Sequence, residues 1–458
     1  MHGVSLKELA TITGGVIKQG EPTAQFDRIS TDTRKLLPGS LFIALRGEKY
    51  DALSFLGAAV AAGAAGLLVD RAIELPDQTL PVLEVADTLT ALQNLAAWNR
   101  ARWRRPLVGI TGSTGKTSTK EILASILNVR WRTVKTPGNY NNEIGLPLTL
   151  LQIDAVSEAA VVEMGMRGFG QIDALCRMAK PTIGVITNTG EAHIELLGSV
   201  ENIARAKGEI LDHLPAYGFA VLPADSALLR QEARRCRGRV IYFGIEATGE
   251  VVAKNIQPVQ AGSRFTVEAD GAAEDYFLPM PGRHNVLNAL AAIAVSREMG
   301  LSPAEIRQGL FNATVTQMRS EIVEYGAVTV INDAYNANPA SVKAALQLLR
   351  EVSAGRKMVA VLGDMLELGE RGVAGHREVG AEAAWLEVDR LVTVGARAAH
   401  IAAGAQAAGL PPERIYPCAG KAEAQETLRQ IMQPGDLVLV KGSRSMGMEQ
   451  IVEWIAAR

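Results

Sequence analysis

The feature that most constrains this chain is a short apolar strand followed at once by a glycine-rich loop and a helix. Residues 107–110 are predicted to form a buried strand, and residues 119–123 have a helical pattern. The loop between them reads Thr111-Gly112-Ser113-Thr114-Gly115-Lys116-Thr117-Ser118. Its glycines let backbone N–H groups point at phosphate oxygens, and the helix amino terminus adds a positive partial charge. The sequence therefore predicts a phosphate-binding loop at the end of a strand of a parallel sheet.

Two side chains of this loop suit a nucleoside triphosphate and its metal ion. Lys116 can bridge the terminal phosphates, and Thr117 can ligate Mg²⁺. The usual loop starts with a further glycine, which Ile110 replaces here. The residues expected to contact the nucleotide are Gly112, Ser113, Thr114, Gly115, Lys116, Thr117 and Ser118. Such a loop indicates that a nucleotide binds and leaves the reaction open.

Polar residues follow two other predicted strands and are expected at the same edge of the sheet. Glu163 ends the strand at residues 159–162, where a carboxylate suits a Mg²⁺ ligand or a residue that orders water. His193 lies in a polar segment, residues 187–193, after the strand at residues 183–186. A histidine there can serve the metal and phosphates, or it can be a structural residue, and both interpretations stay open.

Length and composition indicate a protein of several domains without a charge that would attract nucleic acid or a membrane. The 458 residues are 48% hydrophobic and 21% charged, and the formal net charge is -2, so phosphate binding has to be local. The three cysteines lie far apart, with no spacing that suggests zinc or a disulfide framework. The start of the chain has no signal-peptide pattern, and residues 55–69, the longest apolar stretch, predict a helix leading into a buried strand. We therefore expect a cytoplasmic protein that is not inserted in a membrane.

Changes of pattern along the chain predict an α/β protein of three domains. Residues 1–86 form a small unit, residues 87–316 a central P-loop ATPase domain with a parallel sheet, and residues 317–458 a Rossmann-like domain. The strands of the last domain are expected at residues 328–331, 358–361, 391–394 and 437–440. No G-x-G-x-x-G follows a strand there, so a dinucleotide cofactor is not expected.

Taken together, these motifs resemble the Mur ligase family along nearly the whole chain. The loop of that family is T-G-x-x-G-K-T, which matches residues 111–117 and accounts for the absent first glycine. Residues 281–292 are similar to the segment that holds adenine in the family. The resemblance implies ATP as the nucleotide and an amino-terminal domain that binds a UDP-linked substrate. The further ATP contacts that it implies are Asn285, Asn288, Arg319 and Asp333.

The resemblance also implies a metal site with an unusual ligand. Lys207 matches the lysine of the family's A-K-x-E-I segment, which is carbamylated by carbon dioxide and helps to hold a second Mg²⁺. The other implied metal ligands are Thr117, Glu163 and His193. The implied catalytic residues, which serve the transfer of a phosphoryl group between anions, are Lys116, Lys207, His193 and Arg319.

Three carboxy-terminal segments resemble the family member that joins D-alanyl-D-alanine to UDP-N-acetylmuramoyl-tripeptide. They are residues 332–341, 362–369 and 441–444. The reaction so implied is an ATP-dependent amide ligation through an acyl phosphate, which gives UDP-N-acetylmuramoyl-pentapeptide, ADP and phosphate for peptidoglycan synthesis. The implied contacts with the UDP-linked substrate are Thr33, Arg34, Asn139 and Asn142. The remaining implied substrate contacts are Tyr335, Asn336, Asn338, Asp364 near the dipeptide amine, and Lys441 or Arg444 near its carboxylate.

Two other interpretations stay open. The chain could add a single amino acid, as the diaminopimelate-adding and folate-glutamylating relatives do, although the D-N-P-R signature of the former is not present. It could also be a P-loop protein that uses ATP binding as a switch, although such a module needs no second anionic substrate pocket. Phosphate release that requires both acceptor and amine would distinguish a ligase from a switch.

Overall fold

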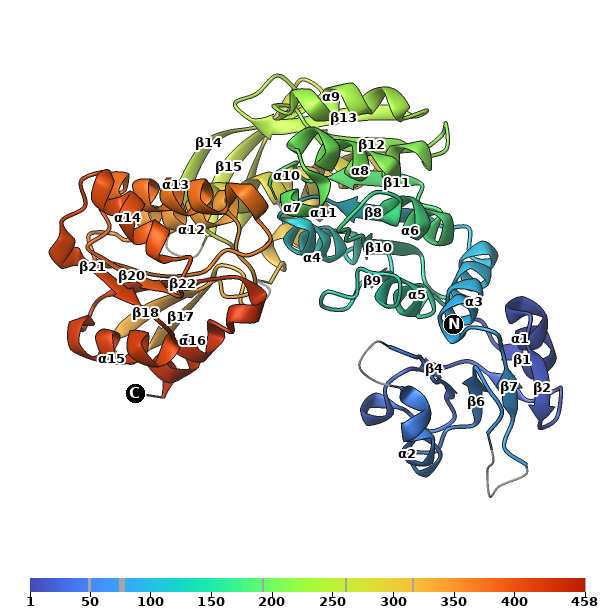
Figure 1. Cartoon of the computed structure of the whole chain (residues 1–458). Coiled ribbons are helices and arrows are strands. Elements are labelled where there is room, and N and C mark those ends of the chain that lie inside the picture. Colours follow the sequence, from blue (N-terminus) through green and yellow to red (C-terminus); the bar gives the residue numbers. More distant parts are fainter. Residues whose placement is uncertain (48–50, 74–78, 192, 260–261, 315–316, 458) are drawn as a thin grey trace.

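The computed structural model describes residues 1–47, 51–73, 79–191, 193–259, 262–314 and 317–457. In this part of the chain a two-stranded sheet and three larger sheets follow one another along the sequence (Figure 1). The larger sheets lie within residues 16–84, 107–278 and 321–441, and we call them, with their helices, the amino-terminal, central and carboxy-terminal units. The predicted boundaries after residues 86 and 316 stay predictions, and residue 316 lies outside the described residues. No described helix is both long and apolar enough to cross a membrane.

The amino-terminal sheet has five strands in the order β2-β7-β6-β5-β4, and β1 pairs with β3 beside it. The strands are β1 (Val4–Ser5), β2 (Val16–Gln19), β3 (Gln25–Phe26), β4 (Ile29–Ser30), β5 (Leu41–Ile43), β6 (Gly66–Val69) and β7 (Val82–Glu84). The helices are α1 (Leu6–Thr13) and α2 (Leu56–Ala61), with 3-10 turns η1 (Thr33–Lys35) and η2 (Ala52–Phe55). The prediction of a helix and a buried strand for residues 55–69 is confirmed by α2 and the fully buried β6.

The central sheet has nine strands in the order β16-β15-β14-β13-β12-β11-β8-β10-β9. They are β8 (Leu107–Thr111), β9 (Thr133–Lys135), β10 (Ala159–Glu163), β11 (Ile183–Ile186), β12 (Phe219–Pro223), β13 (Arg239–Ile245), β14 (Val251–Val259), β15 (Gly262–Ala269) and β16 (Ala272–Leu278). The strand pairs among β8 to β14 are parallel, whereas β15 pairs antiparallel with both β14 and β16. The helices are α3 (Thr88–Arg102), α4 (Lys116–Leu127), α5 (Gly145–Leu150), α6 (Gln171–Ala179), α7 (Ile194–Leu197), α8 (Val200–Asp212), α9 (Ala227–Glu232), α10 (Arg283–Glu298) and α11 (Pro303–Phe311), with η3 (Ala233–Arg235).

Alternate residues of the central strands enter two apolar cores, one on each face of the sheet. From β8, Leu107 packs into one core, and Val108 and Ile110 pack into the other. Helices α3, α5, α6 and α8 contribute to the first core, and α4, α10 and α11 to the second. A parallel sheet covered by helices on both faces is therefore confirmed for this unit.

The register of three central strands brings the predicted polar residues together. Strand β8 lies between β10 and β11, with Glu163 opposite Ile110 and Ile186 opposite Thr111. Because the three strands are parallel, their carboxyl ends meet at one edge of the sheet. The phosphate-binding loop follows β8 at this edge.

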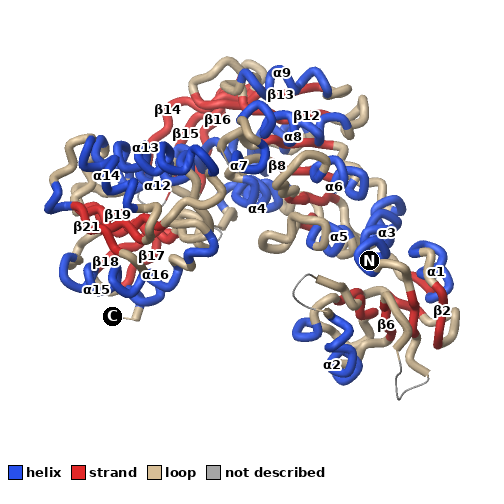
Figure 2. The backbone as a smooth tube through the Cα atoms, viewed as in Figure 1, coloured by secondary structure: helices blue, strands red, loops and turns tan. Residues whose placement is uncertain are grey.

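The carboxy-terminal sheet has six strands in the order β17-β18-β22-β19-β20-β21, and β17 is its antiparallel edge. The strands are β17 (Glu321–Tyr325), β18 (Val328–Asn332), β19 (Met358–Gly363), β20 (Arg390–Val394), β21 (Ile415–Cys418) and β22 (Leu437–Lys441). The helices are α12 (Pro339–Glu351), α13 (Gly372–Trp385), α14 (Ala399–Ala407), α15 (Lys421–Ile431) and α16 (Glu449–Ala456), with η4 (Gly369–Arg371), η5 (Pro412–Arg414) and η6 (Arg444–Met446). Helices α12 to α14 pack on one face and α15 and α16 on the other (Figure 2). The predicted Rossmann-like arrangement is present.

Candidate active site

A cavity of about 1340 Å³ is lined by the carboxyl edge of the central sheet and by residues of the carboxy-terminal unit. The structure brings most of the predicted site residues to this cavity. They are Gly112, Ser113, Thr114, Gly115, Lys116, Thr117, Ser118, Asn142, Glu163, His193, Lys207, Asn285, Asn288, Arg319, Asp333, Tyr335, Asn336, Asn338 and Lys441.

The phosphate-binding loop has a backbone that needs glycine at two positions. Gly112 has φ 150° and Gly115 has φ 78°. A Cβ atom would lie 1.8 Å from Thr187 Oγ1 at the first position and 2.2 Å from Asn288 Oδ1 at the second. Helix α4 then begins at Lys116, and no side chain of the described residues caps its amino end. The first N–H groups of α4 are therefore available to an anion.

Thr117 and Glu163 form a pair of oxygen donors beside this loop. Thr117 Oγ1 donates to Glu163 Oε2 at 2.8 Å, and Asn141 Nδ2 donates to Glu163 Oε1 at 2.8 Å. Glu163 is 1% exposed, and none of the described lysines and arginines forms an ion pair with its carboxylate. A buried carboxylate with hydroxyl and amide neighbours and no paired cation fits a divalent metal ion.

Cations from two units line the same cavity. Lys116 Nζ donates to Gly112 O at 2.7 Å, so the side chain folds over its own loop. Burial lowers the pKa of Lys116, Glu163 raises it, and Arg319 lowers it. Arg319 reaches in from the carboxy-terminal unit, with its guanidinium carbon 4.0 Å from the centre of the Tyr335 ring.

Lys207 is a buried lysine without a counter-ion. It is 2% exposed, and among the described residues it has no hydrogen bond or ion pair. Burial, and after it the nearby Lys116, lower the pKa of Lys207 well below the usual value of a lysine. A neutral amine reacts with carbon dioxide whereas an ammonium does not, so this environment fits the predicted carbamate.

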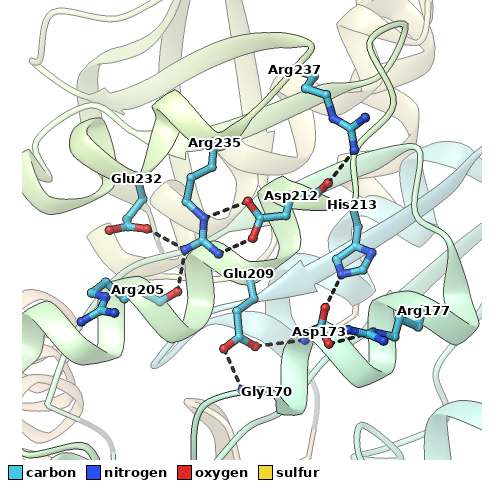
Figure 3. Close-up of polar contacts among 10 residues, drawn as sticks. All are labelled: Gly170, Asp173, Arg177, Arg205, Glu209, Asp212, His213, Glu232, Arg235 and Arg237. Atoms are coloured by element: carbon cyan, nitrogen blue, oxygen red, sulfur yellow. Dashed lines mark hydrogen bonds and ion pairs between the residues drawn. The ribbon is translucent and has the colours of Figure 1, made fainter.

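Ion pairs and a helix cap hold α8, the helix of this lysine, from its other side (Figure 3). Glu209 accepts from the backbone N–H groups of Gly170 at 2.7 Å and Asp173 at 3.0 Å, at the start of α6. At the end of α8, Asp212 pairs with Arg235, whose Nε lies 2.9 Å from Asp212 Oδ1. These contacts join α8 to the start of α6 and to η3.

His193 lines the cavity at the point where the central and carboxy-terminal units touch. Its Nδ1 lies 2.8 Å from Glu367 Oε2, and its backbone is left-handed with φ 64°. Burial lowers the pKa of His193, although the Glu367 carboxylate raises it. Glu367 was not predicted as a site residue, although it lies within residues 362–369, one of the segments that carry the family resemblance.

Lys441 and Asp333 neutralise each other within the cavity. Lys441 Nζ donates to the Asp333 carboxylate and, at 2.9 Å, to Asn336 O. Asp333 Oδ1 also accepts from Ser320 N at 3.0 Å. A lysine that is buried in such a pair is not free to hold another carboxylate. The structure therefore does not show the predicted availability of Lys441 for the dipeptide.

Five predicted substrate residues do not line the cavity, namely Thr33, Arg34, Asn139, Asp364 and Arg444. Asp364 Oδ1 accepts from Ala398 N at 2.7 Å, so this carboxylate caps a turn of its own unit. Arg444 pairs with Glu449 at 2.9 Å. Thr33 and Arg34 belong to η1 of the amino-terminal unit.

A buried lysine that the sequence did not reveal, Lys120, supports the rim of the cavity. It is fully buried on α4, and its Nζ donates to Thr136 O at 2.7 Å and Gly138 O at 3.1 Å. These carbonyls precede Asn141, which holds Glu163. A lysine within a helix is usually solvated, so the pattern gave no sign of this role.

Two family models match this chain. The Mur ligase middle domain matches residues 110–296, and the Mur ligase, glutamate ligase domain matches residues 318–444. Together they cover more than half of the 458 residues. The first match contains the phosphate-binding loop, and the second contains all six described strands of the carboxy-terminal sheet.

Similar proteins match over nearly the full length. A relative in Bacillus subtilis, named UDP-N-acetylmuramoyl-tripeptide–D-alanyl-D-alanine ligase, is 40% identical over 452 residues, which are 98% of this chain and 97% of the relative. A crystal structure of MurF from Acinetobacter baumannii has a TM-score of 0.90 and 32% identity, and each chain covers 100% of the other. A crystal structure of MurF ligase from Thermotoga maritima in complex with ADP has a TM-score of 0.81 and 28% identity, over 94% of this chain and 97% of that one. The chain therefore belongs to the Mur ligase family and, within it, to the MurF group.

Proposed function

We propose that this protein is an ATP-dependent ligase that joins D-alanyl-D-alanine to UDP-N-acetylmuramoyl-tripeptide and gives UDP-N-acetylmuramoyl-pentapeptide, ADP and phosphate. The Bacillus subtilis relative is named for these two substrates, and the Thermotoga maritima structure holds ADP. One observation carries the proposal. The phosphate-binding loop, the Thr117–Glu163 pair and the strand ends of the carboxy-terminal unit line a single cavity.

The reaction needs ATP because hydroxide is a poor leaving group from a carboxylate. Transfer of the γ-phosphoryl group to the tripeptide carboxylate gives an acyl phosphate, and attack by the dipeptide amine forms the amide and releases phosphate. In the first step two anions approach each other, so positive groups have to offset charge in the transition state. We assign this role to Lys116 and Arg319, which reach the cavity from different units.

The proposed metal site uses Thr117, Glu163, His193 and the carbamate of Lys207. Mg²⁺ bound there would neutralise phosphate oxygens and polarise the transferred group. The carbamate replaces a lysine cation, which would repel the metal, by an anion that attracts it. Glu163 and Lys207 support this assignment, since each is buried and forms no ion pair among the described residues.

The three units are proposed to hold different parts of the substrates. The UDP group would lie against Thr33 and Arg34 in residues 1–86, and its peptide would reach the cavity past Asn139 and Asn142. A long substrate of this kind explains why Asn142 lines the cavity while Thr33 does not.

ATP is proposed to bind between residues 87–316 and 317–458, which would exclude water from the acyl phosphate when the units close. Asn285 and Asn288 would contact the base, and Asp333 the ribose. The dipeptide would lie against Tyr335, Asn336 and Asn338, which line the cavity. Since ATP and UDP-linked precursors are cytoplasmic metabolites, we place the reaction in the cytoplasm.

Phosphate release tests the proposed function. Purified protein with ATP and Mg²⁺ should release phosphate rapidly when UDP-N-acetylmuramoyl-tripeptide and D-alanyl-D-alanine are both present, and slowly when either is omitted. Release that is independent of both substrates would indicate an ATP-driven switch. Release that is equally fast with a single amino acid would indicate a ligase of the amino-acid-adding type.

A further inference from the structure

Among the contacts between the central and carboxy-terminal units are those of residues 191 and 193–197 with residues 367–371. Arg371 Nη2 donates to Glu191 Oε1 at 2.9 Å. A Cβ on Gly369 would lie 3.2 Å from Cα of Glu195, so the two backbones are in close contact there. The segments belong to different units, and their contact forms one wall of the junction beside the cavity.

Within this junction His193 and Glu367 face each other. His193 Nδ1 lies 2.8 Å from Glu367 Oε2, but the angle at the Nδ1 hydrogen is far from linear, so the ring has to rotate before this nitrogen donates to the carboxylate. Both residues have left-handed backbones, with φ 64° for His193 and φ 61° for Glu367, a conformation that residues other than glycine seldom adopt. Two uncommon conformations at facing positions indicate that the surrounding structure imposes the contact.

The two nitrogens of the His193 ring are placed for different tasks. The ring lines the cavity, whereas Glu367 does not, so the carboxylate approaches the ring from outside the cavity. Nδ1 is closed off from solvent. When Nδ1–H donates to a carboxylate, the lone pair of Nε2 is free and more basic, which is the usual arrangement of a metal-binding histidine.

Arg167 keeps the carboxylate in reach of the histidine. Arg167 Nη2 lies 3.7 Å from Glu367 Oε1, so the second carboxylate oxygen has a cation nearby while the first faces His193. The Glu367 side chain is itself 45% exposed.

We propose that Glu367 is a positioning residue that sets the tautomer and orientation of His193, so that the metal site of the central unit is complete only while the carboxy-terminal unit touches it. This role rests on the proposed function, because it presupposes that His193 binds the metal. It gives the contact between the units a chemical consequence. A metal ion and nucleotide bind more tightly when Glu367 has docked, and by linkage their binding favours the docked arrangement.

Binding of Mn²⁺ in place of Mg²⁺ tests this role without turnover. Mn²⁺ is titrated into the full-length protein with saturating ADP, and free Mn²⁺ is measured by electron paramagnetic resonance. Glu367→Ala should weaken Mn²⁺ binding by about 10- to 100-fold, as the loss of an outer partner of a metal-binding histidine does. Glu367→Gln should recover part of the affinity, because its amide oxygen can still accept from Nδ1–H. Glu370→Gln, in the same segment, is the matched control and should bind like the wild type.

Two further variants separate orientation of the histidine from simple loss of the junction. Arg371→Met removes the contact with Glu191 and should weaken Mn²⁺ binding less than Glu367→Ala does. If Glu367 acts through His193, Glu367→Ala should not weaken Mn²⁺ binding any further in a protein that already carries His193→Ala. Equal effects of Arg371→Met and Glu367→Ala, or additive effects of Glu367→Ala and His193→Ala, would overturn the proposal.

A kinetic split distinguishes this role from the proposed function. In Glu367→Ala the KM for Mg²⁺ should rise about 10- to 100-fold, while kcat at saturating Mg²⁺ stays close to the wild type. If the wild type binds Mn²⁺ normally and Glu367→Ala binds it equally well, the positioning role of Glu367 is refuted and the proposed function is not affected. A wild-type protein that binds no Mn²⁺ in the presence of ADP would refute the metal assignment and this role together.

Discussion

Thr117 Oγ1 donates a 2.8 Å hydrogen bond to Glu163 Oε2, which joins the first turn of α4 to the end of β10. This contact links two segments that are 46 residues apart in the sequence. It places a hydroxyl and a carboxylate beside the phosphate-binding loop, where a divalent ion would neutralise the phosphates of ATP.

Glu163→Gln tests this pair with little change in shape. The amide oxygen can accept from Asn141 while the amide N–H donates to the Thr117 hydroxyl, which can also accept, but the amide lacks the charge that a metal requires. We expect turnover at low Mg²⁺ to fall at least about 100-fold, because a direct ligand matters no less than an outer partner. The melting temperature should change little, since Glu163 has no ion-pair partner among the described residues. Wild-type turnover across a Mg²⁺ titration would contradict the assignment.

Lys207→Ala should be nearly inactive, because it removes the proposed carbamate ligand from α8. A short carboxylic acid such as acetate should restore part of the turnover by occupying the vacated space with an anion. The matched measurement is wild-type turnover in buffer stripped of carbon dioxide and bicarbonate, which should fall and then recover when bicarbonate is added. Full activity of Lys207→Ala in the stripped buffer would rule out the carbamate.

Glu209→Gln should destabilise the protein almost as much as Glu209→Ala. Two backbone donors, Gly170 N and Asp173 N, bind separate oxygens of Glu209, so the glutamine would face one of them with an N–H group. The loss of such a cap costs about 1 kcal/mol. Thermal unfolding of the three proteins measures it, and a Gln variant as stable as the wild type would show that a single acceptor suffices.

His376 predicts a pH dependence of stability. The ring is fully buried, Nδ1 donates to Gly372 O at 2.6 Å, and Nε2 accepts from Met365 N at 3.0 Å, so the folded protein holds it neutral. Burial lowers its pKa below the ordinary value of 6.5. The contribution of the neutral His376 ring to the free energy of unfolding is therefore complete above about pH 6.5. It is lost as pH falls below this value, because the unfolded chain then binds a proton that the folded chain does not.

The pH dependence of stability from His376 is limited, because only one proton is taken up on unfolding. Stability should fall by up to about 1.4 kcal/mol per pH unit below pH 6.5 until the folded pKa is reached. His376→Gln should be less stable at pH 7.5, but its melting temperature should fall less than that of the wild type between pH 6.5 and pH 5.5. His2→Gln, in a different part of the chain, is the control for removal of a partly exposed histidine. Equal slopes for the wild type and His376→Gln would contradict the prediction.

The fold was predictable where local pattern and tertiary structure agree. Buried strands such as β6 and β8 are short apolar runs. The glycines of the phosphate-binding loop stand where a Cβ atom would clash with neighbouring side chains, and their spacing is visible in the sequence. The residue types at strand ends predicted that Glu163 would approach the loop, because parallel strands bring their carboxyl ends together.

The remaining site residues depend on contacts between distant segments, which no local pattern contains. Lys441 or Arg444 was expected near a substrate carboxylate, and the pairing of Lys441 with Asp333, which follows a different strand, was not predicted. Lys120 gave no signal, since a lysine in a helix is usually solvated, and the segment that contains Glu367 did not show which of its residues would reach the site. Their roles follow from burial and partners that arise only when the units pack together.

The most direct test of the central claim is mass spectrometry of the product formed from UDP-N-acetylmuramoyl-tripeptide, ATP, Mg²⁺ and D-alanyl-D-alanine. Tripeptides ending in meso-diaminopimelate and in lysine should both be tried, with free D-alanine as the matched amine. A site that recognises the far carboxylate of the dipeptide should react much more slowly with the shorter amine. The proposed ligase should form UDP-N-acetylmuramoyl-pentapeptide, with one ADP released per amide. ATP hydrolysis without any amide product, or equal rates with free D-alanine, would contradict it.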